Sequence, residues 1–216
     1  MASGGDLVGT VFAELERLIA TRRIVPGQKI NENQLALELK VSRAPVREAV
    51  RRLEQYGLID IIPHRGAVLR KLGLKDILDL YDVRAGLAYA AGRLLPTRAT
   101  PADLEELRQL LAEMEHAAVD EDCAGFGVAN VTFHERLFAI AGNQPLARLA
   151  AQQEMLLQSF LRDEIRNPRM LRESNTQHKA IVEAIAYNDP EDCARAFNRH
   201  IVIGKQRLVD SGHFSE

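Results

Sequence analysis

Residues 31–66 read NENQLALELKVSRAPVREAVRRLEQYGLIDIIPHRG, and this stretch decides the fold of the first third of the chain. Ser42 is a preferred helix N-cap, and Pro45 is tolerated within a first helical turn. Gly57 is a common residue just beyond the end of a helix. The stretch is therefore predicted to be built around one helix over 43–56.

Further elements are predicted on both sides of this helix. An amphipathic helix precedes it, a short helix can be capped by Asn31 or Asn33, and Pro63-His64-Arg65-Gly66 separates two β-prone runs. The predicted helices are 6–22, a short one after Asn31 or Asn33, and 43–56, and the predicted strands are 58–62 and 67–70. Three helices and a hairpin form a winged helix-turn-helix, which we assign to residues 1–72.

The two faces of the predicted helix 43–56 differ in chemistry. One stripe is apolar and consists of Val46, Ala49, Val50 and Leu53. Arg43, Arg47 and Arg51 recur every four residues and share another face. Such a helix fits the major groove of DNA, where an arginine can bind guanine O6 and N7 or a phosphate. A single arginine is more often a solvated surface residue, so the combination with the hairpin and the local charge carries the interpretation.

Two further features indicate contacts with a DNA backbone. Ser42 lies at a helix N-terminus, which favours anions such as phosphate. His64 and Arg65 at the tip of the hairpin offer donors, and Gly66 permits close backbone approach. The segment from Arg22 to Lys71 holds eleven Lys/Arg and five Asp/Glu, a net charge of +6, whereas the whole chain carries −2, so the remainder carries −8. A basic block on an acidic body points to a polyanion partner for the block.

The rest of the chain, 73–216, is predicted to be an all-helical domain of six helices. Proline, glycine and aspartate punctuation separates the spans 74–95, 101–119, 122–141, 145–166, 168–187 and 190–210. The sequence has no apolar run of the roughly 20 residues that a membrane helix needs. It has only two cysteines, far apart, so a reducing cytoplasmic location is expected. The predicted fold class is mainly α, a winged helix-turn-helix followed by an all-α six-helix bundle.

Three histidines lie on the apolar faces of three separate predicted helices. They are His134, His178 and His200, each next to aliphatic or phenylalanine residues. A lone buried histidine is usually a hydrogen-bonded core residue. Three neutral imidazoles that converge would suit Zn²⁺, Ni²⁺ or a similar metal ion, so the sequence leaves a metal site and a set of core histidines as alternatives.

Arg84 is the second candidate of the helical region. It lies among Leu80, Val83 and Leu87 on a helix that should be largely buried. A buried arginine needs an anionic partner. The partner can be an internal Asp or Glu, or a small carboxylate ligand held against the metal.

The first part of the chain closely resembles the winged helix-turn-helix of GntR-family bacterial transcription regulators over about residues 8–70. The matching residues are Pro26-Gly27, Leu35-Ala36, Val41-Ser42-Arg43-Ala44-Pro45-Val46-Arg47-Glu48-Ala49, Leu53, Gly57-Leu58 and Arg65-Gly66. The resemblance implies that Ser42, Arg43 and Arg47 contact DNA, and that Asn33 and the wing residues His64–Gly66 assist. Some relatives carry Arg where Asn33 stands.

The remainder, about 74–210, resembles the effector-binding FCD domain of the FadR-type branch, in its shorter VanR-like form. The residues that carry this are Leu80-Tyr81-Asp82-Val83-Arg84, Phe133-His134, His178 and Asn198-Arg199-His200. In many members an Asp four residues before the first histidine joins three histidines as metal ligands, and this chain has Asn130 there. The family often has Glu where Ala88 stands, so Arg84 lacks that neighbour. Effectors of the family are commonly organic acids.

The leading hypothesis is therefore a homodimeric regulator, most simply a repressor, that binds a near-palindromic double-stranded DNA operator. A small carboxylate, with or without a metal, would control it. A metal-dependent hydrolytic enzyme is the second hypothesis, but no general base is evident beside the histidines, so no catalytic residue is assigned. The third is a DNA-binding dimer whose helical domain is only a scaffold, which Asn130 and Ala88 favour.

Overall fold

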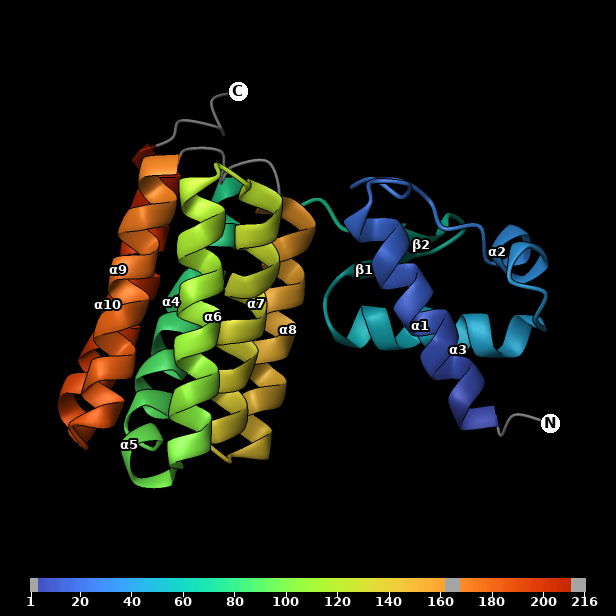
Figure 1. Cartoon of the computed structure of the whole chain (residues 1–216). Coiled ribbons are helices and arrows are strands. Elements are labelled where there is room, and N and C mark those ends of the chain that lie inside the picture. The colour runs from blue at the N-terminus through green and yellow to red at the C-terminus, as the bar shows by residue number, and fades with distance from the viewer. Residues whose placement is uncertain (1–3, 162–167, 211–216) are drawn as a thin grey trace. The chain divides into compact units, whose positions relative to one another are not determined.

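The computed structural model describes residues 4–161 and 168–210, and the main division along the chain falls between Gly73 and Leu74. The first unit contains α1 (Gly4–Ala20), α2 (Glu32–Glu38), α3 (Arg43–Gln55), β1 (Ile59–Ile62) and β2 (Gly66–Leu69). These are the three helices and the hairpin that the sequence predicts (Figure 1). The short helix α2 is capped by Asn31, whose side chain accepts a hydrogen bond from the Gln34 amide.

The core of this unit forms between α1, α3 and the hairpin. α1 packs along α3, and the largest fully buried side chains include Leu15, Leu53, Leu58, Ile59 and Leu69. The strands are antiparallel, with Ile59 opposite Leu69 and Ile62 opposite Gly66. His64 and Gly66 have positive φ angles of 62° and 86°, so the tip turns tightly. The wing therefore projects residues 63–65 from a hairpin whose base is buried.

The second unit is a bundle of helices. Its elements are α4 (Leu74–Gly92), α5 (Leu95–Arg98), α6 (Pro101–Val119), α7 (Cys123–Ile140), α8 (Gln144–Leu161), α9 (Pro168–Ala186) and α10 (Pro190–Asp210). The six predicted helices all form, and the four-residue α5 is an addition, because the sequence around Pro96 predicts only a break. The end of the predicted helix 145–166 lies outside the described residues. The predicted fold class, mainly helical with a winged helix-turn-helix and a helical bundle, is confirmed.

Close helix packing positions the inner faces of the bundle. α4 packs along α10, and α6 packs between α7 and α9 (Figure 1). Gly92 of α4 approaches α10 so closely that a Cβ atom there would lie 2.5 Å from the Ala194 Cα. The core is filled by Leu, Ala, Ile and phenylalanine side chains, with Phe126, Phe133 and Phe197 fully buried. His134, His178 and His200 each lie on one of these inner faces.

Candidate metal centre and nucleic-acid interface

The surface of the first unit presents the arginine face of α3 to solvent. Arg43 and Arg47 are exposed, whereas Val46 and Pro45 on the other side of the helix are buried. Ser42 occupies the N-cap in an extended conformation and makes no side-chain capping hydrogen bond, so its hydroxyl remains available to a ligand. The local sequence thus produces the amphipathic helix that the periodicity predicts.

The remaining predicted DNA-binding residues are also exposed. Asn33 lies on α2 beside Glu32, whose carboxylate is 3.4 Å from the Arg47 Nε. His64, Arg65 and Gly66 form the tip of the wing. The Arg65 guanidinium donates a 3.5 Å hydrogen bond to the Gly27 carbonyl, which ties the wing to the loop after α1. These residues leave their donors where a phosphate backbone can reach them.

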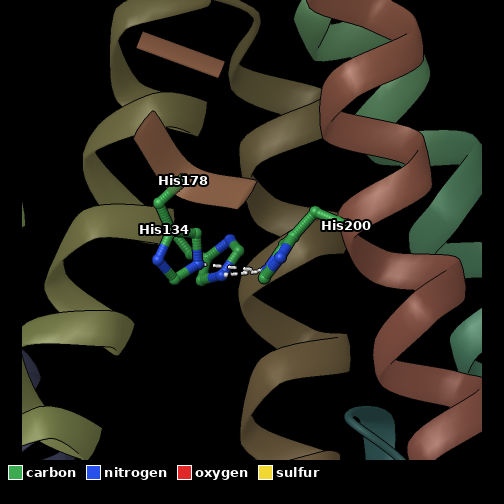
Figure 2. A group of neighbouring side chains, drawn as sticks. All are labelled: His134, His178 and His200. Carbon is green, nitrogen blue, oxygen red and sulfur yellow. Dashed lines mark hydrogen bonds between the residues drawn. The ribbon is translucent and has the colours of Figure 1, made fainter. Parts of the chain in front are cut away.

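The three predicted histidines meet inside the helical bundle. His134 comes from α7, His178 from α9 and His200 from α10, and Figure 2 shows their rings pointing toward one another. The His200 Nε2 lies 3.1 Å from the Nε2 of His178 and 3.1 Å from that of His134. One nitrogen from each ring lies within 4.8 Å of the others, and all three residues are buried. Convergence of three imidazoles from separate helices is the arrangement that holds a metal ion.

The donor set fits a metal better than it fits a histidine hydrogen-bond cluster. Each neutral imidazole has one N–H and one lone pair. Gln177 Oε1 lies 3.0 Å from the His200 Nδ1 and accepts its proton, so His200 Nε2 carries a lone pair. One lone pair cannot accept from both neighbouring rings at full strength. In a tetrahedral zinc site with Zn–N distances of 2.0–2.1 Å, neighbouring nitrogens are about 3.3 Å apart. The two 3.1 Å spacings from the His200 Nε2 are close to this value.

The surroundings of the triad keep its imidazoles neutral. Phe133 lies 4.7 Å from the His178 ring centroid, and Phe197 stacks on His134 at 5.7 Å. Burial, together with the positive charges of Arg207 and Arg84, lowers the pKa of His178 to about 3. Burial and then Arg84 lower the pKa of His134 well below its usual value, and burial does the same to the pKa of His200. Neutral rings with free lone pairs are the form that binds a metal.

Asn130 lies one helical turn before His134 on α7 and is half-buried. Its amide oxygen carries no charge, so it would be a weaker ligand than a carboxylate at that position. Its role as a fourth ligand stays a prediction.

Arg84 has an internal partner that the sequence did not identify. Its guanidinium forms an ion pair with the Glu154 carboxylate of α8, and both side chains are largely buried. The internal-carboxylate alternative is therefore present in the structure. Glu154 also lines a cavity of about 190 Å³ together with His134 and Glu135. No spacing in the sequence links Arg84 to Glu154, because they lie on helices that meet only in the folded bundle. Gln177 was missed for the same reason.

Known proteins match this chain along nearly its whole length. Residues 7–69 match the model of bacterial regulatory proteins of the gntR family, and residues 79–202 match the FCD domain. The Nta operon transcriptional regulator of Aminobacter aminovorans is 33% identical over 182 residues, which cover 82% of each chain. The probable D-xylose utilization operon transcriptional repressor of Paenarthrobacter nicotinovorans is 30% identical, covering 85% of this chain and 80% of the relative.

A solved structure, Escherichia coli McbR/YncC, has the same fold. It superposes with a TM-score of 0.81 at 23% sequence identity and covers 98% of this chain and 99% of its own.

An exposed arginine helix with a wing, joined along the chain to a helical domain with a buried polar centre, defines a DNA-binding regulator with a sensory domain. The chain belongs to the GntR family of bacterial regulators and carries an FCD domain. It is a DNA-binding transcription regulator, and the hydrolase alternative is set aside because the family and its relatives are regulators, not enzymes. In the part of the chain that the structure describes, no helix combines the length and apolar character needed to span a membrane.

Proposed function

We propose that this chain is a homodimeric repressor whose helical domain binds a small organic acid at a divalent metal ion held by His134, His178 and His200. The observation that carries the proposal is the convergence of three buried Nε2 atoms within the electrostatic reach of Arg84. Zinc or nickel suits three neutral nitrogen donors, with Asn130 as the proposed fourth ligand. Bound there, the metal would act as a Lewis acid toward a carboxylate oxygen of the effector.

The DNA-binding role is assigned to individual residues. Arg43 and Arg47 bind base edges or phosphates from α3 in the major groove, and Ser42 binds a phosphate at the helix N-terminus. Asn33 and the wing residues His64–Gly66 contact the backbone on either side. Two protomers place two such units on a near-palindromic operator, because a two-fold protein reads a two-fold site. Its DNA partner implies a cytoplasmic location.

Arg47 provides the test of the DNA-binding assignment. The operator is first selected from a randomised duplex library with the purified protein. Arg47→Ala is expected to lower the affinity for this operator about 5- to 150-fold, since a good base contact contributes about 1–3 kcal/mol. Arg148→Ala, at an exposed position of α8, is the control and should bind as the parent does. Equal operator affinity of the Arg47→Ala and parent proteins would overturn the assignment.

Metal content tests the sensory site. Protein purified without chelator is expected to contain one divalent ion per chain by elemental analysis, and His134→Ala and His200→Ala are expected to lose it. A thermal-shift screen of organic acids then identifies the effector, because a ligand of the native state raises its apparent stability.

The scaffold alternative keeps one specific observation in its favour, since Glu154 already neutralises Arg84. Protein that carries no metal and responds to no acid would favour it.

A further inference from the structure

The Arg84–Glu154 ion pair joins two helices across the sensory site. Arg84 lies on α4 and Glu154 on α8, and the side chains are only 10% and 15% exposed. A buried guanidinium needs a counter-anion, because an unpaired charge in this setting is strongly destabilising. An acid that forms this same ion pair with Arg84 takes the place of the carboxylate already there.

Glu154 also faces empty space. The cavity that it lines holds about 190 Å³ and is bounded by Phe138, by the alanines Ala139, Ala147, Ala150 and Ala151, and by His134 and Glu135. An apolar cavity of about 150 Å³ can hold benzene, so this cavity suits a small molecule of a few carbon atoms. Its wall is mainly apolar, and its charged side chains are Glu135 and Glu154. Glu154 thus stands between a cavity of ligand size and the buried arginine.

The two glutamates of the cavity set its preference for charge. Glu135 and Glu154 line the same cavity, so a ligand there meets two carboxyl groups. A ligand carboxylate that entered beside both would meet repulsion. A ligand carboxylate that replaced Glu154 at Arg84 would conserve the charge there and lie next to His134. A second carboxylate on the ligand would still face Glu135.

We propose that Glu154 is an internal competitor of the effector, and that the effector is a small monocarboxylic acid with an apolar body whose carboxylate displaces Glu154 from Arg84. This rests on the proposed function of the sensory domain and deepens it. Glu154 is then a specificity-determining residue: only acids that bind Arg84 better than the resident side chain can enter. Glu135 selects against dicarboxylates.

Butyrate serves as the probe, titrated calorimetrically into the full-length, metal-loaded protein at constant ionic strength. Glu154→Gln is expected to bind butyrate at least tenfold more tightly than the parent, because the amide removes the competing charge and keeps the side-chain shape. Glu135→Gln is the matched variant, since it removes the other cavity carboxylate. It is expected to strengthen succinate binding more than butyrate binding.

A double variant controls for indirect effects and for misfolding. Arg84→Met with Glu154→Gln removes both charges and leaves neither buried alone, so it is expected to fold. It should lose the tight butyrate binding of Glu154→Gln.

Three results would overturn the proposal. The first is equal butyrate affinity in Glu154→Gln and in the parent. The second is tight butyrate binding that persists in the double variant. The third is the absence of butyrate binding in both the parent and Glu154→Gln. Operator binding and the acid screen are measured separately on the parent protein. The proposed regulatory function therefore holds even when butyrate does not displace Glu154 from Arg84.

Discussion

At the scale of single residues, the triad couples protonation to stability. The pKa values of all three histidines are lowered by burial, and Arg84 and Arg207 face them with positive charge. The unfolded chain therefore takes up protons near the ordinary value of 6.5, whereas the folded protein resists them. Below that pH the unfolded state binds more protons, so stability falls as pH falls toward the folded value, about 3 for His178.

Metal-free protein should accordingly lose stability between pH 7.5 and 5.5. The expected slope approaches about 1.4 kcal/mol per pH unit for each histidine once the pH is below its unfolded value. Burial raises the pKa of Glu135 from 4.5, so this group titrates in the opposite sense, and the comparison with a histidine variant isolates the histidine contribution. Urea unfolding in chelator measures it, and His178→Phe should reduce the slope by about one proton. A free energy of unfolding that does not change over this pH range would show that the folded triad accepts protons readily.

Gln177 should tune metal binding without being a ligand. Its oxygen accepts the His200 Nδ1 proton and fixes the tautomer that leaves Nε2 free. Gln177→Leu is expected to weaken zinc binding about 10–100-fold, as measured by competition with a chromogenic chelator. Glu183→Gln, exposed on the same helix α9, is the control and should have no effect. Unchanged zinc affinity in Gln177→Leu would mean that the ring is oriented by other contacts.

At the scale of elements, the contact between α4 and α10 depends on one glycine. A methyl group at Gly92 would meet backbone atoms of Ala194 and Cys193 at 2.5–2.9 Å, and backbone cannot rotate aside. Gly92→Ala is therefore expected to destabilise the protein by about 1–3 kcal/mol.

A glycine-to-alanine change at Gly86, on the same helix, is expected to have the opposite effect on stability. Gly86 is exposed, and a Cβ atom added there would meet nothing within 4 Å, so Gly86→Ala should stabilise by about 0.5–1 kcal/mol through helix propensity. Urea midpoints of the two variants compare them directly. A shift of the urea midpoint in the same direction for both variants would show that α4 and α10 are not in close contact. These are the helices that carry Arg84 and His200.

At the scale of the whole molecule, net charge is a poor guide to its behaviour with DNA. The chain carries −2, but the stretch from Arg22 to Lys71 carries +6. Operator affinity should therefore fall steeply with salt, with a log–log slope of about −5 if six phosphates are neutralised.

Fluorescence anisotropy between 50 and 200 mM KCl measures this slope. Arg43→Ala should reduce its magnitude by about one if that residue contacts a phosphate, and Arg148→Ala should leave it unchanged. A slope near zero for the parent protein would contradict electrostatic binding by the basic segment.

Local sequence determines much of the architecture. Ser42, Pro45 and Gly57 bound α3, and its period of apolar and arginine residues sets which side is buried, so the helix and its exposed face follow from short-range rules. The presence of three histidines on apolar helix faces also follows from periodicity. Local rules were weaker where two signals compete: Pro96 can break a helix or begin one, and here it lies in the first turn of α5.

Sequence alone thus determined the helices, the wing and the identity of the candidate residues. Only the tertiary structure decided that the Nε2 atoms of three distant histidines meet, that Gln177 holds His200, and that Glu154 neutralises Arg84. Periodicity gives the face of a helix that turns inward, but not which neighbour that face meets or at what height along the axis. Those are set by close packing, such as the approach of α4 to α10 at Gly92, and they decide the chemistry of the buried centre.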